Sequence, residues 1–240
     1  MLSSMKNLAR QYYDQFSKGY DDQRHLGYHR FLDESEVRIT EPYLGPRVLE
    51  AGCGTGLVAE RLKTRCESMN GFDLSFGMLQ KAKSRVDRVS QASVTDLPFA
   101  DNIFDTVVSF KVLAHVQDIK TAMAEMARVT KPGGYLVLEF YNRTSLRTMI
   151  KKLKPAHATS DAYSDEDMYT RYDTKADIQS YLPRNLEWID AKGIRVFTPL
   201  ASIANLPVIG HLTLSGERLA TNTPFLTNYG GFLVAILRKH

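Results

Sequence analysis

The chain has 240 residues, of which 43% are hydrophobic and 24% charged, a composition typical of a folded domain with one sizeable core. Its formal net charge of +4 is too small to argue for a polyanionic partner, so we expect no nucleic acid to bind. Two cysteines are too few for a disulfide framework and lack the paired spacing of a zinc site, which favours a reducing, cytoplasmic location.

The N-terminal segment, residues 1–40, is rich in tyrosine and charge and predicts one or two helices that cover the domain. Residues 1–16 are interrupted by polar side chains, and no run of 18 apolar residues occurs in the chain, so we expect neither a secretory signal nor a transmembrane helix. His25 and His29 share a helical face if the segment is helical there, but no third ligand has matching spacing. We therefore predict no metal site and interpret the pair as surface or lid residues.

The core is expected between Arg47 and Tyr141, where short β-branched runs alternate with helical patterns, as they do in βαβ units of a parallel sheet. A helix over residues 119–129 places several apolar side chains on one face, and the Lys131–Gly134 turn ends it. The predicted strands of this region are 47–51, 68–73, 88–91, 104–110 and 134–141.

Beyond the core, residues 142–175 lose this alternation and become first basic and then acidic, which we interpret as an insertion over the site. A helix at 174–182 follows, and then strands at 186–198 and 232–238.

A strand that runs into alternate glycines, Val-Leu-Glu-Ala-Gly-Cys-Gly-Thr-Gly at 48–56, is the strongest motif. Glycine lets the backbone turn sharply and lets a ligand approach closely, and the helix start after it offers free N–H groups. The dinucleotide fingerprint requires its third glycine where this chain has Leu57, which disfavours a nicotinamide oxidoreductase.

Two carboxylates follow at the ends of the next predicted strands. Asp73 ends the second strand beside the glycine loop, where a carboxylate can accept hydrogen bonds from the two hydroxyls of a ribose. Asp96, in the turn after the third strand, is placed to accept from the exocyclic amine of a purine. The alternatives are a helix-capping role for Asp73 and a turn-initiating role for Asp96.

The chain resembles class I S-adenosylmethionine-dependent methyltransferases, especially the small-molecule branch that includes the quinone-biosynthesis enzymes. The resemblance rests on an ordered set of motifs, namely 50–56, Asp73, 96–99, 104–110, 112–118 and 128–134. The resemblance covers residues 10–141. It implies an α/β fold with a Rossmann-like, seven-stranded, mostly parallel sheet and helices on both faces, whose last two strands pair antiparallel at one edge. It also implies one domain, with a cover (1–40), a cofactor-binding core (41–141), a lid insertion (142–175) and a C-terminal part (176–240).

The implied cofactor is S-adenosylmethionine, which leaves as S-adenosylhomocysteine. Tyr20 would fold over its methionine end, and Leu74 and Met78 would sandwich the adenine, although packing alone explains all three. The residues assigned to cofactor binding are Tyr20, Glu50, Gly52, Cys53, Gly54, Gly56, Asp73, Leu74, Met78, Thr95, Asp96, Leu97 and Phe110.

The resemblance predicts methyl transfer to a small-molecule acceptor at O, C or N by in-line displacement, which needs few catalytic groups. His115 follows the fourth strand and is a candidate base, and a structural hydrogen bond explains it equally well. The run Ser109–Val112 lacks the Asn-Pro-Pro-aromatic pattern of methyltransferases acting on DNA amines. A catalytically silent cofactor binder is the alternative of a different class.

Residues 143–154 place cations around an apolar stripe at helical spacing. One interpretation is a lid that makes peripheral contact with a membrane-borne acceptor, and the other is a surface helix packed on the core.

Overall fold

The computed structural model describes residues 2–22, 24, 27–145, 148, 169–197, 207–221 and 223–240. The helices and strands, with two short 3-10 turns (η), are in chain order α1 (Leu2–Phe16), α2 (Gly27–Thr40), η1 (Glu41–Tyr43), β1 (Arg47–Ala51), α3 (Leu57–Lys63), β2 (Ser68–Asp73), α4 (Phe76–Ala82), β3 (Arg88–Gln91), β4 (Phe104–Ser109), η2 (Leu113–His115), α5 (Ile119–Val129), β5 (Thr130–Tyr141), α7 (Lys175–Ser180), β6 (Leu186–Ile194), α9 (Pro207–Thr221), α10 (Pro224–Thr227) and β7 (Phe232–Lys239).

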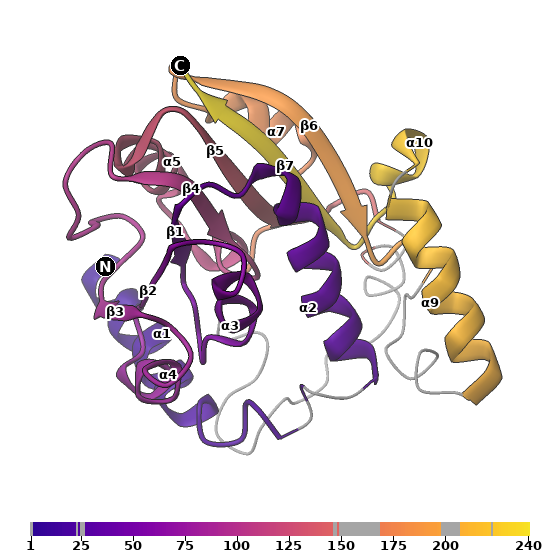
Figure 1. Ribbon diagram of the computed structural model, residues 1–240, viewed down its shortest axis with the longest axis horizontal. Coiled ribbons are helices and arrows are strands. Elements are labelled where there is room, and N and C mark those ends of the chain that lie inside the picture. Colours follow the sequence, from indigo (N-terminus) through magenta and orange to yellow (C-terminus); the bar gives the residue numbers. More distant parts are fainter. Residues whose placement is uncertain are drawn as a thin grey trace.

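One seven-stranded sheet in the order β3-β2-β1-β4-β5-β7-β6 forms the centre of the molecule (Figure 1). The strands from β1 to β5 pair in parallel, and β7 runs antiparallel to both of its neighbours, β5 and β6. This confirms the expected fold class and the antiparallel pairing at one edge. Chain order reverses between β1 and β4, and the carboxyl edge of a parallel sheet at such a point is where ligands usually bind.

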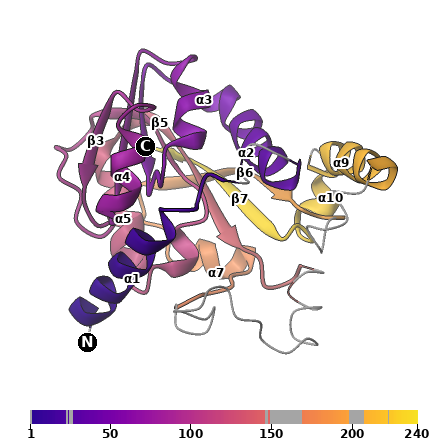
Figure 2. The same cartoon turned by 90° about the horizontal axis from the view of Figure 1, so that it is seen from below.

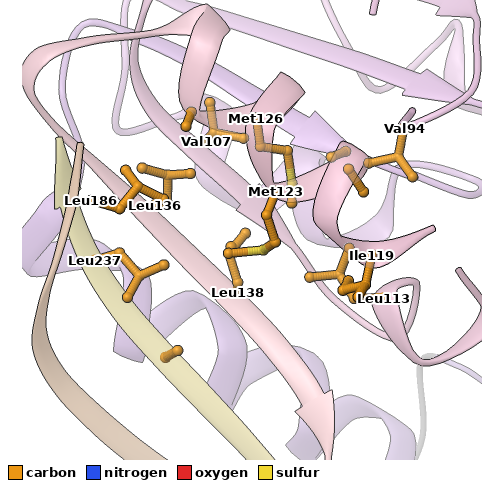
Figure 3. Close-up of a cluster of buried hydrophobic side chains, with 14 of the residues drawn as sticks. Val94, Val107, Leu113, Ile119, Met123, Met126, Leu136, Leu138, Leu186 and Leu237 are labelled. Atoms are coloured by element: carbon orange, nitrogen blue, oxygen red, sulfur yellow. The ribbon is translucent and has the colours of Figure 1, made fainter. Parts of the chain in front are cut away.

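Apolar side chains fill both faces of the sheet because successive residues of a strand point to opposite sides. In β4, Val107 belongs to the cluster beneath α5, whereas Val108 belongs to the cluster beneath α2 and α3. The two helix layers lie on either side of the sheet when the molecule is seen from below (Figure 2). Met123 of α5 lies beside Leu138 of β5 in the first cluster (Figure 3). The predicted apolar face of this helix is fully buried, which confirms its assignment.

Several element ends differ from the sequence-based expectation. Strand β4 ends at Ser109, because Lys111 adopts a positive φ of 61° that takes the chain out of the sheet. Strand β5 starts earlier than expected, at Thr130, which pairs with Phe104 before a register shift. Strand β6 ends at Ile194, one residue before Arg195 with φ 67°.

The N-terminal cover consists of two helices, where one or two were expected, and α1 is tied to the core through side chains. Asp14 Oδ1 accepts hydrogen bonds from Ser75 Oγ at 2.6 Å and from the backbone N–H of Gly77 at 2.9 Å. A Cβ at Gly77 would lie 2.6 Å from Ser17 Oγ and 3.0 Å from the Asp14 carbonyl oxygen, so the end of α1 approaches the first turn of α4 closely enough to crowd any side chain there. The cover is therefore docked at the start of α4.

Some expectations fall outside the described residues. They include His25 and most of the predicted lid insertion and of the basic helix at 143–154, since residues 146–147 and 149–168 are not described. Within the described ranges, no helix has the length and apolar character needed to cross a lipid bilayer.

Candidate functional site

A cavity of about 260 Å³ opens at the carboxyl edge of β1, β2 and β4, close to the lower end of the ~300–1,000 Å³ range of small-molecule pockets. Most of the residues singled out from the sequence line it, and these are Tyr20, Gly52, Gly54, Asp73, Leu74, Met78, Thr95, Phe110 and His115. The remaining five do not line it, and these are Glu50, Cys53, Gly56, Asp96 and Leu97.

The glycine loop after β1 forms the floor of this cavity. Gly52 has φ 74°, and a Cβ there would lie 2.3 Å from Val112 Cγ2, so a side chain would collide with the loop after β4. Gly54 has φ 53°, and its Cβ would meet nothing within 4 Å. A side chain at Gly54 would instead extend into open space at the pocket wall. The loop thus fits a ligand that approaches the backbone itself.

Asp73 lies at the end of β2 with both carboxylate oxygens oriented by the backbone. Oδ2 accepts the Gly54 N–H at 2.8 Å, and Oδ1 accepts the Ser75 N–H at 2.8 Å. Burial raises the pKa of Asp73, and these N–H donors oppose that shift. Each carboxylate oxygen can accept a further hydrogen bond, so the group remains able to bind two vicinal hydroxyls.

Apolar residues form the wall next to Asp73. Phe72 lines the cavity from β2, Leu74 from the segment after it and Met78 from α4, while Val94 lines it from the turn after β3. The Ser75 hydroxyl accepts the Met78 N–H at 3.1 Å and so caps the first turn of α4. An apolar wall of this kind suits packing against the face of a heteroaromatic ring.

The predicted residues that do not line the cavity support it from outside or lie away from it. Glu50 is buried beneath the loop at 3% exposure, and the Cys53 sulfur packs against Gly71. Gly56 is the N-cap of α3. Asp96 is exposed in a tight turn, and Leu97 is part of the core. Their roles in cofactor binding stay predictions.

Two tyrosines of the N-terminal cover complete the pocket. Tyr20 lines it as predicted, and the Arg24 guanidinium lies 4.8 Å from the centre of its ring. Tyr13 also lines it and was not singled out from the sequence, although its helical spacing from Tyr20 was a usable signal. Burial raises the pKa of both phenols, so both carry neutral hydroxyls.

His115 lines the pocket, and its ring is oriented by a hydrogen bond of Nδ1. Nδ1 lies 3.0 Å from the carbonyl oxygen of Tyr169, and because a carbonyl can only accept, Nδ1 carries the proton of that hydrogen bond. In the neutral ring Nε2 is then the acceptor. The rings of Tyr13 and Tyr141 lie 6.4 and 5.6 Å from the imidazole, centre to centre.

Sequence reasoning missed Lys111, which lines the pocket between Phe110 and Val112. Its Nζ contacts two acidic residues of α2, Asp33 and Glu36. The signal available in the sequence was a lysine directly after a buried strand, together with acidic residues in otherwise apolar stretches. No group of three or more histidine, cysteine or acidic side chains in the described part of the chain is arranged to hold a metal ion.

Comparison with known proteins matches residues 49–138 to a family described as "Methyltransferase domain". The chain is 38% identical over 120 residues to the demethylmenaquinone methyltransferase of Thermobifida fusca, an alignment that covers 47% of this chain and 51% of that protein. It is 34% identical over 161 residues to the 2-phytyl-1,4-naphtoquinone methyltransferase of Nostoc sp., covering 60% and 70%. The chain therefore spans between about half and about two thirds of these relatives.

Among solved structures, an S-adenosylmethionine-dependent methyltransferase of Thermotoga maritima superposes with a TM-score of 0.68. The match is 21% identical and covers 96% of this chain and 98% of that one, which establishes likeness of fold.

Proposed function

The chain belongs to the class I S-adenosylmethionine-dependent methyltransferases, and from that premise we propose that its acceptor is a small aromatic molecule with an ionisable hydroxyl, such as a quinol. The relatives named above act, by their names, on naphthoquinone-type rings. The observation that carries the proposal is the imidazole of His115, which lines the same pocket as Asp73 and lies against two tyrosine rings.

Different residues of the pocket bind different parts of the cofactor. The backbone of Gly52 and Gly54 provides close approach, Asp73 is the acceptor for the ribose hydroxyls, and Leu74 and Met78 provide an apolar wall for the adenine. When bound, S-adenosylmethionine supplies an electrophilic methyl carbon attached to a positively charged sulfur. Tyr13 and Tyr20 cover this region and exclude water from it.

The acceptor is bound between the cover and the loop after β4. Tyr13, His115 and Tyr169 line this part of the cavity, and aromatic walls of this kind favour a planar ring. The walls orient the acceptor so that its nucleophilic atom faces the methyl carbon, and this orientation is the main catalytic contribution of the protein.

His115 acts as the general base in this proposal. Its Nε2 takes the proton of the acceptor hydroxyl, and the resulting phenolate directs its electron pair, at oxygen or at a ring carbon, to the methyl carbon. The bound cofactor would supply this methyl group, and its sulfur would keep the electron pair of the carbon–sulfur bond. For attack at a ring carbon, the proton on that carbon passes to solvent to restore aromaticity, and His115 returns its proton to the phenolate oxygen. For attack at oxygen, His115 passes its proton to solvent.

The test is transfer of radiolabelled methyl from S-adenosylmethionine to a reduced naphthoquinone and, in parallel, to a cell extract separated into lipid, small polar and macromolecular fractions. The Asp73→Ala variant is the control for transfer that depends on the pocket. Label in the naphthoquinol or the lipid fraction supports the proposal. Label only in small polar or macromolecular fractions overturns the aromatic acceptor, and cofactor binding without label anywhere favours the silent binder.

A further inference from the structure

A short segment, residues 169–173, runs across the turn η2 and then beside the end of β5. The Arg171 N–H donates to the Ala114 carbonyl oxygen at 2.8 Å, and the Asp173 N–H donates to the Tyr141 carbonyl oxygen at 2.8 Å. Asp173 also forms a parallel bridge with the residue that follows β5. The backbone of the 169–173 segment is therefore attached both to η2 and to the end of the sheet.

The side chains of Arg171 and Asp173 form a bidentate ion pair within this segment. Arg171 Nη2 lies 2.8 Å from Asp173 Oδ1, and Nε lies 3.1 Å from Oδ2. The pair is shielded from water, since Asp173 is 3% exposed and the Arg171 guanidinium lies 4.8 Å from the centre of the Tyr181 ring. Two hydrogen bonds at fixed spacing orient both groups, and removal of one partner leaves a buried charge unpaired.

The start of the segment contacts His115, which is 54 residues away in the chain. The Tyr169 carbonyl oxygen accepts the Nδ1–H at 3.0 Å, and Thr170 Oγ1 lies 3.4 Å from the same nitrogen. In a neutral imidazole the proton resides on one of the two nitrogens, and a hydrogen bond made by either nitrogen selects the tautomer. Because Tyr169 and Thr170 directly precede Arg171, the position of their two oxygen atoms depends on how the rest of the segment is held.

The ring contacts of His115 do not make this selection. The rings of Tyr13 and Tyr141 lie against the imidazole and restrict its plane, but this packing is available whichever nitrogen carries the proton. A carbonyl oxygen at Nδ1 does distinguish the tautomers, because it accepts a hydrogen bond only from a protonated nitrogen. The 169–173 segment therefore provides a contact that selects the tautomer.

We propose that Arg171 and Asp173 are positioning residues, whose ion pair holds the 169–173 segment against η2 so that His115 keeps its proton on Nδ1. Neither residue lines the cavity, so both act through the segment and not on a ligand. The catalytic consequence rests on the proposed function, because the tautomer with a proton on Nδ1 carries on Nε2 the lone pair that a base uses. The selection of the tautomer does not depend on that role.

The first test observes the tautomer by ¹⁵N NMR of protein labelled at histidine, with the His115 signals assigned by their loss in His115→Gln. In a neutral imidazole the protonated and unprotonated nitrogens give well separated signals. We expect the unaltered protein to carry the proton on Nδ1, and we expect Asp173→Asn, which removes the charge and keeps the size, to shift the population toward Nε2. Unchanged signals in the folded variant overturn the proposal.

A second variant, Arg171→Gln, keeps the test decisive if Asp173→Asn does not fold. Arg171 is the more exposed partner, at 15% of its side chain against 5% for Asp173, and the same shift toward Nε2 is expected. The matched control is Arg143→Gln, which removes the 2.6 Å ion pair with Asp177 beside the segment and leaves the pair of Arg171 and Asp173 intact. The control should leave the His115 signals unchanged, and an equal shift in it overturns the proposal.

The second test separates the positioning role from the proposed function. It measures kcat for methyl transfer to a reduced naphthoquinone and, by calorimetry, the Kd for S-adenosylmethionine. For Asp173→Asn we expect kcat to fall about 10- to 100-fold, as a small displacement of a catalytic group can cause, with Kd unchanged. A shifted tautomer with unchanged kcat supports the positioning role and refutes His115 as the base, whereas a lower kcat with an unchanged tautomer overturns the positioning role.

Discussion

Asp73 receives hydrogen bonds from the backbone N–H groups of Gly54 and Ser75 through its two oxygens, so this carboxylate and the glycine loop form one unit. Replacing it with alanine removes an acceptor that carries a charge, and we expect cofactor binding to weaken by about 1.5–3 kcal/mol. Calorimetric titration measures the loss, with melting temperature as a check on folding. Asp190→Ala is the control, because Asp190 lies in β6 and does not line the cavity. Unchanged affinity in the folded Asp73 variant would contradict the ribose assignment.

His115 presents a different case, because its hydrogen bond to Tyr169 fixes the tautomer that a base requires. For His115→Ala we expect turnover to fall by about 10²–10⁴-fold, the range for general base catalysis, with cofactor affinity retained. Equal loss of turnover and of cofactor affinity would instead indicate that His115 only lines the pocket.

At the scale of elements, the contact between α1 and α4 decides whether the cover closes the pocket. Gly77 permits this contact, because a Cβ would lie 2.6 Å from Ser17 Oγ and 3.0 Å from the Asp14 carbonyl oxygen. Alanine at position 77 favours the helix by about 1 kcal/mol but pushes α1 away, so we expect the KM for S-adenosylmethionine to rise several-fold. Gly216→Ala in α9, where the nearest atom is 3.6 Å away, is the matched control. Equal KM values in both variants would show that the cover does not contribute.

At the scale of the whole molecule, the buried carboxyl groups link stability to pH. The pKa of Glu139 is raised above its ordinary value of 4.5 by burial and by Glu36, so the folded protein binds its proton more tightly than the unfolded chain does. Its contribution is fully present below that value and is lost as pH rises through the folded pKa. The free energy of unfolding of the unaltered protein, minus that of Glu139→Gln, should therefore fall as pH rises above 4.5. Denaturant titrations at several pH values check this, and a constant difference would contradict it.

Local patterns in the sequence were sufficient to predict most of the helices and strands of the fold. Alternation of apolar residues places strands such as β1 and β2 at the predicted positions, and the glycine loop follows from the residues themselves. Asp73 was predictable because the carboxyl ends of neighbouring parallel strands meet at one edge of the sheet, whatever the rest of the chain does. Antiparallel pairing of β7 was carried over from the family resemblance, since strand periodicity does not specify strand order.

Only the tertiary structure decided the contacts between segments that lie far apart in the chain. Lys111 looked like an ordinary loop residue until α2 brought Asp33 and Glu36 to it, and nothing near Gly77 indicates that α1 packs there. Conversely, Asp96 has a sequence position that suits a ligand but a side chain that is exposed. The periodicity of apolar residues is a local property that the backbone alone sets, whereas the partner of a charged side chain depends on how distant elements pack.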